Sequence, residues 1–219
     1  MKIYAHRGIS GRYPENTLAA FRAALEEGVY GVELDIHASA DGIPVVIHDD
    51  SLDRTTNASG SVRDLTAAEL AALDAGNGQG VPTFDDVVTL AQGRLHFDVE
   101  IKGANCEQGV LDVLSRNPGT KAAISSFEWD VLAKVRAIAP DVELWVLTST
   151  VTDEAIATAR ELQATTLAVM HLSISRETFQ RTSAAGLEVM AWTVNRKSEA
   201  DRLRDLGVVA ICTDDPRYL

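Results

Sequence analysis

Short β-rich apolar runs alternate with amphipathic segments along nearly the whole chain. Apolar side chains at every second position are typical of strands, and apolar side chains three or four positions apart are typical of helices. On this basis the chain contains eight strand-like runs with seven helical segments between them. The runs end near Arg7, His37, Lys102, Phe127, Thr148, His171, Asn195 and Asp214.

Residues that suit helix ends support this division. The first helix is expected to begin near Asn16 and Thr17 and to end at Gly28, which suits a left-handed stop. Strict alternation predicts parallel strands joined by helical crossovers, and eight units favour a closed (β/α)₈ barrel over the alternative of an open doubly wound sheet. Further helices are expected to begin at Asp153, Ser175 and Ser198, and similar left-handed stops are expected at Gly93, Gly186 and Gly207, each of which precedes a new strand.

One stretch, between residues 37 and 83, breaks the alternation. The pair Asp41-Gly42 signals a hairpin, and an apolar run follows it. The polar remainder holds one short helical candidate, residues 66–74, and no second hydrophobic core is expected in it. We interpret residues 49–82 as an insertion over the barrel mouth, where barrel enzymes build their sites.

The chain is expected to form a single domain over residues 1–219. It ends almost directly after the eighth run, so the last barrel helix is predicted to be missing or vestigial. A hydrophobic fraction of 46% and a charged fraction of 24% are ordinary for one globular domain. No apolar run approaches the roughly 18 residues that span a bilayer, and the N-terminus does not resemble a signal peptide. We therefore expect a cytoplasmic protein without stable membrane association.

Net charge narrows the range of partners. Twenty Lys and Arg residues against thirty-two Asp and Glu residues give a net charge of -12. This charge repels nucleic-acid backbones and anionic membrane surfaces at long range. Nucleic acid is therefore not expected as a partner, and the oligomeric state is left open.

Five residues with reactive side chains are expected to be structural. Cys106 and Cys212 have neither metal-site spacing nor a nearby base, so we predict two buried thiols rather than a disulfide, a zinc site or a nucleophile. His37, His96 and His171 are likewise expected to be structural. His37 also has an alternative role, in support of the site, because it alternates in phase with the acidic residues of its run.

Charged residues follow the strand alternation in two of the runs. Glu33 and Asp35 share one face of their run, and Glu100 and Lys102 share one face of theirs. Three carboxylates would then meet beneath one mouth and would repel one another unless protons or a cation accompany them. Oxygen-only ligands favour one Mg²⁺ or Ca²⁺ ion. A layer of salt bridges with Arg7 and Lys102 is the alternative.

Two histidines fall at the ends of strand-like runs. His6 precedes Arg7, and His48 precedes Asp49. Beside a carboxylate-bound cation, acid–base work is the favoured role for both, because imidazole exchanges protons near neutral pH. Asp49 could stabilise an imidazolium, which favours His48 as the acid.

Together these residues resemble the glycerophosphodiester phosphodiesterase family. The resemblance runs in the family's order and covers nearly the whole chain. It rests on His6-Arg7-Gly8, Pro14-Glu15-Asn16-Thr17, Glu33-Leu34-Asp35, His48-Asp49, Leu52-Asp53-Arg54-Thr55-Thr56, Glu100-Ile101-Lys102, Trp192-Thr193-Val194-Asn195 and Thr213-Asp214-Asp215-Pro216.

The resemblance implies a (β/α)₈ (TIM) barrel with a segment inserted after the second strand, as the interrupted alternation also suggests. It implies divalent-metal ligands at Glu33, Asp35 and Glu100, catalytic histidines at His6 and His48, and phosphate contacts from Arg7 and Lys102.

Phe127 and Trp192 are candidates to pack against the apolar side of the substrate, with packing in the barrel core as the alternative. The expected reaction is hydrolysis of a glycerophosphodiester to glycerol 3-phosphate and an alcohol. Two alternatives are a phospholipase D-like or cyclising lyase activity on a lipid phosphodiester, and a non-catalytic barrel that binds a phosphorylated ligand. The insertion has no basic amphipathic stretch, which favours small head-group substrates over lipids.

Overall fold

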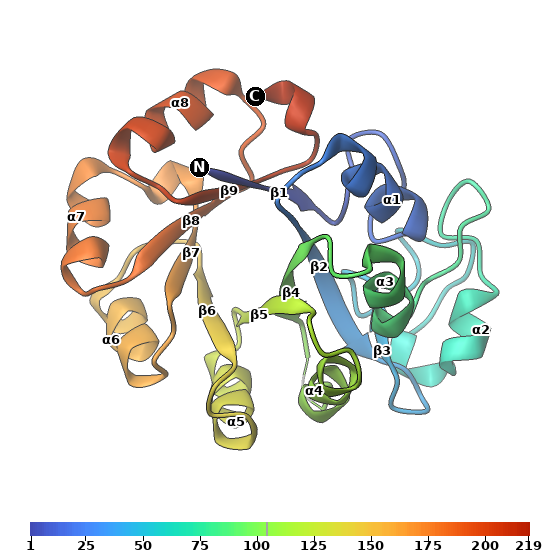
Figure 1. The fold of residues 1–219 in the computed structure, drawn as a ribbon. Coiled ribbons are helices and arrows are strands. Elements are labelled where there is room, and N and C mark those ends of the chain that lie inside the picture. The colour runs from blue at the N-terminus through green and yellow to red at the C-terminus, as the bar shows by residue number, and fades with distance from the viewer. Residues whose placement is uncertain (104) are drawn as a thin grey trace.

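Nine strands form one sheet in this structure, a computed structural model that describes residues 1–103 and 105–219. Eight of them are parallel to their neighbours, and β1 pairs with both β2 and β9, so the sheet closes into a barrel (Figure 1). The predicted (β/α)₈ barrel is therefore confirmed, and the open sheet is excluded. The barrel strands are β1 (Lys2–His6), β2 (Gly31–Ala38), β4 (His96–Ile101), β5 (Lys121–Ser126), β6 (Glu143–Thr148), β7 (Thr166–Met170), β8 (Glu188–Trp192) and β9 (Ala210–Thr213).

In the described residues, seven helices join these strands and lie around the outside of the barrel (Figure 1). After β9 the chain continues into a single 3₁₀ turn, η3 (Pro216–Tyr218), in place of an eighth helix, as predicted. In the described part of the chain no helix combines the length and apolar character that crossing a membrane requires. The seven helices are α1 (Leu18–Glu27), α3 (Phe84–Ala91), α4 (Glu107–Arg116), α5 (Trp129–Ile138), α6 (Asp153–Glu161), α7 (Arg176–Ala184) and α8 (Lys197–Leu206).

Most of the predicted helix ends are confirmed. The side chain of Thr17 accepts a hydrogen bond from the Ala20 amide at the start of α1, and Gly28 ends that helix with φ = 67°. Ser175 caps α7 through a reciprocal pair of hydrogen bonds with Thr178. Such bonds satisfy amides that have no partner within the helix.

Three boundaries differ from the predictions. α8 already begins at Lys197, so Ser198 lies inside its first turn rather than at the cap. The left-handed residue that ends α3 is Gln92, one position before Gly93. β8 ends three residues before Asn195, although the Val194 amide still donates to a carbonyl of β9 beyond the strand end. Each shift is small because helix and strand ends depend on backbone hydrogen bonds that residue type alone does not specify.

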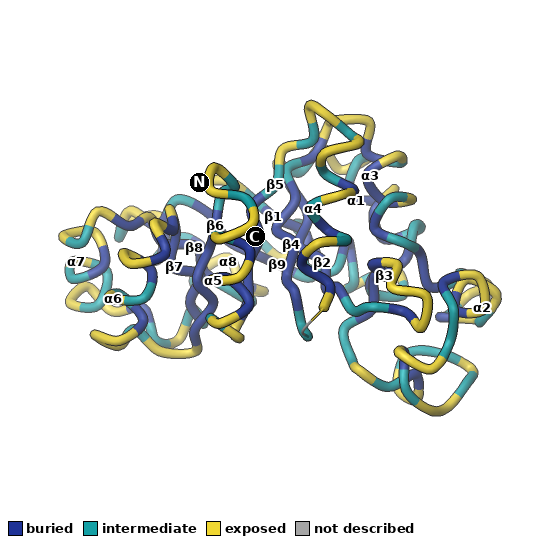
Figure 2. The backbone as a smooth tube through the Cα atoms, turned by 90° about the horizontal axis from the view of Figure 1, so that it is seen from below, coloured by how far each residue is buried: buried dark blue, intermediate teal, exposed yellow. Residues whose placement is uncertain are grey.

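The interrupting stretch starts with the predicted hairpin. Gly42, with φ = 76°, turns the chain into β3 (Pro44–Val46), which pairs antiparallel with β2. A 3₁₀ turn η1 (Val62–Asp64) and a short helix α2 (Ala67–Ala71) follow, so the predicted helix of residues 66–74 is shortened at its C-terminal end. In Figure 2 this stretch lies at one side of the barrel.

The expectation that this stretch lacks a hydrophobic core is wrong. Its buried side chains form a cluster separate from the two clusters of the barrel. The cluster was missed because turns, not one periodic helix or strand, bring its isolated apolar residues together. It consists of Val45, Ile47, Leu52, Val62, Ala67, Leu70, Ala75 and Val81.

The lumen of the barrel has an apolar part and an acidic part. The acidic part belongs to the neighbouring strands β2 and β4, whose register places Glu33 opposite Asp98 and Asp35 opposite Glu100. Cys212 belongs to the apolar part, and both cysteines of the chain are free and buried, as predicted. The apolar part is made by Tyr4, Ala123, Trp145, Leu147, Ala168, Met190, Ala210 and Cys212.

We predict that Gly31→Ala destabilises the barrel. A Cβ atom at Gly31 would lie 2.6 Å from the Tyr4 ring and would also meet the carbonyl oxygen of His96. Overpacking of this kind costs roughly 1–3 kcal/mol. Gly103→Ala is the control, because its nearest atom would be 3.8 Å away, at His37 Nδ1, and the change should be less than about 0.5 kcal/mol. Urea denaturation would contradict the prediction if both variants were equally stable.

Candidate active site

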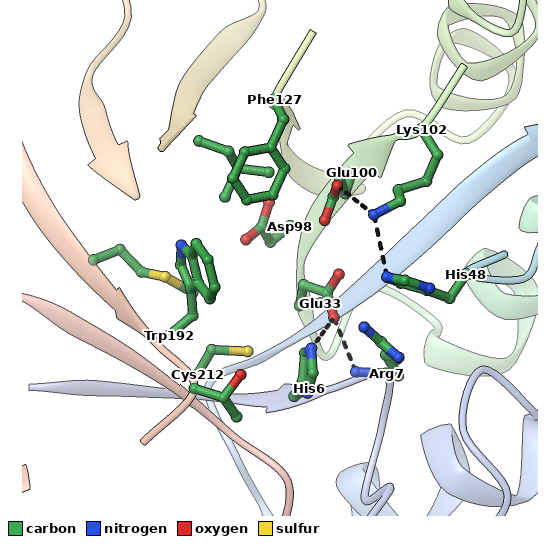
Figure 3. A pocket seen from close by; sticks show the side chains of 13 residues that line it. His6, Arg7, Glu33, His48, Asp98, Glu100, Lys102, Phe127, Trp192 and Cys212 are labelled. Atoms are coloured by element: carbon green, nitrogen blue, oxygen red, sulfur yellow. Dashed lines mark hydrogen bonds and ion pairs between the residues drawn. The ribbon is translucent and has the colours of Figure 1, made fainter. Parts of the chain in front are cut away.

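A cavity of about 160 Å³ opens at the carboxyl ends of the barrel strands and brings the predicted site residues together (Figure 3). All of these residues except Asp35 line it. Asp35 lies fully buried and within ion-pair distance of two of the lining residues. The predicted residues in the lining are His6, Arg7, Glu33, His48, Glu100, Lys102, Phe127 and Trp192.

A sharp turn after β1 explains the His-Arg-Gly sequence at its end. Arg7 and Gly8 both have left-handed backbone conformations, with φ = 55° and 75°. A Cβ atom at Gly8 would lie 2.7 Å from the backbone of Ala20, so only glycine fits there. The turn directs the Arg7 amide to Glu33 Oε2, at 3.0 Å.

Three carboxylates meet at the base of the cavity. Glu33, Asp35 and Glu100 can each offer one oxygen, and these oxygens lie within 4.8 Å of one another. The Asn16 amide donates to Asp35 Oδ2 at 2.8 Å. Asp35 Oδ1 is buried and has no hydrogen-bond partner among the described residues. A buried carboxylate oxygen without a donor, beside two further carboxylates, is suited to ligate a cation.

The pKa shifts of these carboxyl groups also favour a bound cation. Burial raises the pKa of Glu33 well above its ordinary value, and the charges of Asp35 and Glu100 raise it further. Burial, followed by the charge of Asp35, also raises the pKa of Glu100. Ionisation of the three groups is therefore costly unless positive charge is placed among them. The residues fit a hard divalent cation with oxygen ligands.

The two basic residues of the site contact these carboxylates. Lys102 Nζ lies 2.9 Å from Glu100 Oε1 and 3.7 Å from Asp35 Oδ1. Arg7 Nε lies 3.2 Å from Asp35 Oδ2. The alternative salt-bridge layer is thus partly present. Asp98 adds a fourth buried acidic side chain to the lumen, so two basic side chains stand against four acidic ones.

Both candidate catalytic histidines have the same arrangement. His6 Nδ1 lies 2.6 Å from Asp214 Oδ1, and His48 Nδ1 lies 2.5 Å from Asp49 Oδ1. A carboxylate at Nδ1 selects the tautomer with the proton on that nitrogen and leaves Nε2 available for the site. The presence of Asp49 therefore does not distinguish His48 from His6 as the acid.

Two further contacts hold His48. Lys102 Nζ lies 3.2 Å from His48 Nε2, a distance at which the ammonium donates to an unprotonated nitrogen. His37 Nε2 lies 3.0 Å from the carbonyl oxygen of His48. A carbonyl oxygen can only accept, so His37 donates through Nε2, and burial lowers the pKa of this ring. His37 therefore supports the backbone of His48, not the acidic residues with which it alternates.

The wall opposite the carboxylates is apolar (Figure 3). The rings of Phe127 and Trp192 pack edge to face, with 5.5 Å between their centroids. Leu147 and Met190 extend the same wall. Phe127 is 41% exposed, so it does not belong to the barrel core. Trp192 Nε1 is buried without a hydrogen-bond partner in the described residues.

Several site residues had no assigned role in the sequence. Asp98 alternates in phase with Glu100, and this signal could have found it. Burial raises the pKa of Asp98 to about 7 although Ser125 Oγ donates to it at 2.6 Å. Asp214 follows the eighth strand, which the barrel closure places beside β1. No sequence pattern predicts the contact of Asn16 with Asp35, because it depends on how the loop after β1 folds back over β2.

Comparison with known proteins agrees with this geometry. A family model described as the glycerophosphoryl diester phosphodiesterase family matches residues 6–218. The chain belongs to this family. Members of the family are phosphoric diester hydrolases, so the predicted enzyme class is confirmed.

Three proteins similar to this chain are matched over nearly their whole length. The chain is 35% identical to a glycerophosphodiester phosphodiesterase of Caldanaerobacter subterraneus, with 99% of this chain and 95% of the relative covered. An Oleispira antarctica phosphodiesterase, solved in complex with the product sn-glycerol-3-phosphate, has a TM-score of 0.95 and 29% identity, with 99% and 94% covered. A glycerophosphodiester phosphodiesterase of Agrobacterium tumefaciens has a TM-score of 0.88 and 29% identity, with 100% and 98% covered.

The raised pKa of Asp98 predicts how stability depends on pH. Folded Asp98 keeps its proton up to about pH 7, whereas the ordinary value of an Asp is 3.8. The unfolded chain releases the proton first, so stability is lost as pH rises from about 4 through 7. In chelator-treated protein, Asp98→Asn should raise the free energy of unfolding by roughly 1–4 kcal/mol at pH 8 and change it little at pH 4.

Urea denaturation at the two pH values measures this effect. Asp141→Asn is the control, since Asp141 is an exposed Asp outside the barrel lumen. Its free energy of unfolding should match that of the unchanged protein at both pH values. A less stable Asp98→Asn protein at pH 8 would contradict the prediction.

Proposed function

We propose that this protein is a metal-dependent glycerophosphodiester phosphodiesterase, which hydrolyses its substrate to glycerol 3-phosphate and an alcohol. One observation carries the proposal: two carboxylate-held histidines line a cavity at whose base three carboxylates can converge on a cation. The name of the Caldanaerobacter relative and the glycerol 3-phosphate bound to the Oleispira structure support it.

A phosphodiester resists attack because its negative charge repels the incoming oxygen. A Mg²⁺ or Ca²⁺ ion at Glu33, Asp35 and Glu100 would supply positive charge for the phosphoryl oxygens when bound. Arg7 and Lys102 add two cationic groups at the rim of the same cavity and would contact the phosphate. Their contacts with the carboxylates hold both side chains in place before the substrate arrives.

The two histidines would move the protons. One Nε2 takes the proton from the attacking oxygen, and the other histidine, protonated on Nε2, gives its proton to the alkoxide as the bond between phosphorus and that oxygen breaks. The attacking oxygen belongs either to water or to a neighbouring glycerol hydroxyl. In the second case a transient cyclic phosphate forms, and water opens it to the same products. Asp214 and Asp49 stabilise the imidazolium that each histidine becomes.

The small volume of the cavity favours a small substrate over a lipid. Its volume of about 160 Å³ lies below the roughly 300–1,000 Å³ of typical drug-sized sites. Phe127 and Trp192 would pack against the carbon atoms of the glycerol or of the alcohol. The aspartate partners of both histidines argue for catalysis over simple binding of a phosphorylated ligand.

Removal of the metal tests the proposal most directly. Release of glycerol 3-phosphate from several glycerophosphodiesters should stop after chelation and return when Mg²⁺ or Ca²⁺ is added. Alanine at Glu33, Asp35 or Glu100 should lower kcat/KM by at least about 10²-fold while the protein stays folded, since each change removes a repelling charge.

Glu107→Ala is the matched control, because Glu107 is buried on α4 away from the cavity. It should retain the kcat/KM of the unchanged enzyme. Full activity of metal-stripped protein would contradict metal dependence. If all three site variants unfolded, the salt-bridge alternative would be correct.

The two histidines are distinguished by the leaving group. His6→Ala and His48→Ala should each lose roughly 10²- to 10⁴-fold in kcat/KM on a substrate with an alkyl alcohol. p-Nitrophenol needs little protonation as it leaves, so the variant without the general acid should recover most of its rate on a p-nitrophenyl ester. The variant without the base should not recover.

His171→Ala serves as the control for this comparison, because His171 pairs with Glu199 and does not line the cavity. It should behave like the unchanged enzyme on both substrates. Equal losses in both site variants, with no recovery on the p-nitrophenyl ester, would mean that the histidines do not divide acid and base work.

A further inference from the structure

Arg54, in the segment that follows β3, joins two carboxylates that belong to different parts of the site. Its Nε and Nη2 contact Asp49 at 2.6 and 3.0 Å, and its Nη1 and Nη2 contact Glu15 at 3.0 and 2.8 Å. Both pairs are two-pronged, so they restrict the orientation of each carboxylate as well as its distance. Glu15 itself lies in the loop between β1 and α1.

Each carboxylate in turn holds a residue that lines the cavity. Asp49 Oδ1 lies 2.5 Å from His48 Nδ1, and Glu15 Oε1 accepts a hydrogen bond from Arg7 Nη1 at 2.9 Å. Glu15 Oε1 is therefore shared by two guanidinium groups. A continuous chain of contacts runs from the imidazole of His48 through Arg54 to the guanidinium of Arg7.

We infer that Arg54 is a positioning residue that orients His48 and Arg7 together for the reaction proposed above. Its guanidinium touches neither the cavity nor the reacting atoms, and it acts through Asp49 and Glu15. One side chain outside the cavity thereby sets the geometry of a proton-transfer group and of a phosphate-binding group.

Two features separate this role from simple stabilisation of the fold. The side chain of Arg54 is 48% exposed, and ion pairs of such exposure add little to the free energy of unfolding. Hydrogen bonds from Arg54 nevertheless hold the pKa of Asp49 well below its ordinary value. Burial alone would raise the pKa of Glu15, but its hydrogen bonds from Arg54 and the charge of Arg7 lower it. Without Arg54, both carboxylates would lose a cationic donor and could rotate away.

The guanidinium shape is essential to this role. Lysine carries the same charge on a single ammonium group, which cannot form two parallel pairs with each of two carboxylates. We therefore expect Arg54→Met and Arg54→Lys both to lower kcat/KM by roughly 10- to 100-fold, the usual cost of a misplaced reacting group. In an Asp49→Asn background, the further loss from Arg54→Met should be smaller, because part of its effect is already absent.

Two controls in the same segment separate position from stability. Arg63→Met removes an exposed positive charge, and Leu70→Ala opens a space in the small cluster of the segment. Both should keep kcat/KM within about threefold of the unchanged enzyme, although Leu70→Ala should lower the unfolding midpoint by more than Arg54→Met does. If Leu70→Ala lost as much activity as Arg54→Met, Arg54 would act only through stability and the inference would be overturned.

A spectroscopic measurement tests the inference without any activity assay. ¹⁵N NMR shifts of the His48 ring should report a proton on Nδ1 in the unchanged protein and a mixture of tautomers in both Arg54 variants. An unchanged His48 spectrum together with unchanged kcat/KM would overturn the inference. If the unchanged protein released no glycerol 3-phosphate, the proposed function would fail, whereas the tautomer comparison would still decide the role of Arg54.

Discussion

Four carboxylates buried side by side in one half of the barrel lumen are the constraint around which the site is organised. Burial raises the pKa values of Glu33, Asp98 and Glu100, and the charges of the neighbouring carboxylates raise them further. The protein places two cations, two amide donors and one hydroxyl donor against these groups, which lowers the repulsion without removing it. Ionisation of all these groups therefore stays costly unless further positive charge is placed among them.

Closure of the barrel brings together side chains that lie far apart in the sequence. The partner of His6 is Asp214, 208 positions later in the chain, and the two meet because β9 pairs with β1. His48 obtains its carboxylate from the next residue but its lysine contact from Lys102, the residue that follows β4. The two histidines therefore become equivalent in local arrangement by different routes. Both present Nε2 to a space bounded by the carboxylates on one side and by Phe127 and Trp192 on the other.

The segment after β3 contributes His48 to the lining of the cavity and Arg54 to the contacts behind it. Its buried apolar side chains form a cluster of their own, and Arg54 is held by its contacts with Asp49 and Glu15. Arg54 then ties the segment to the β1–α1 loop through Glu15. Substitutions within such a segment can alter the geometry of the reacting groups while the barrel stays unchanged. Loops at the mouth take no part in the hydrogen bonds between the barrel strands.

The sequence by itself determined the barrel, because strand and helix periodicity and caps such as Thr17 and Gly28 are local properties of the chain. It also determined that Glu33 and Asp35 share a face, since side chains alternate along any strand. Only the tertiary structure decided that Asp214 belongs to His6, that Arg54 reaches Glu15, and that scattered apolar residues form a separate cluster. These contacts join residues distant in the chain, and their geometry depends on barrel closure and loop packing, for which local residue pattern carries no signal.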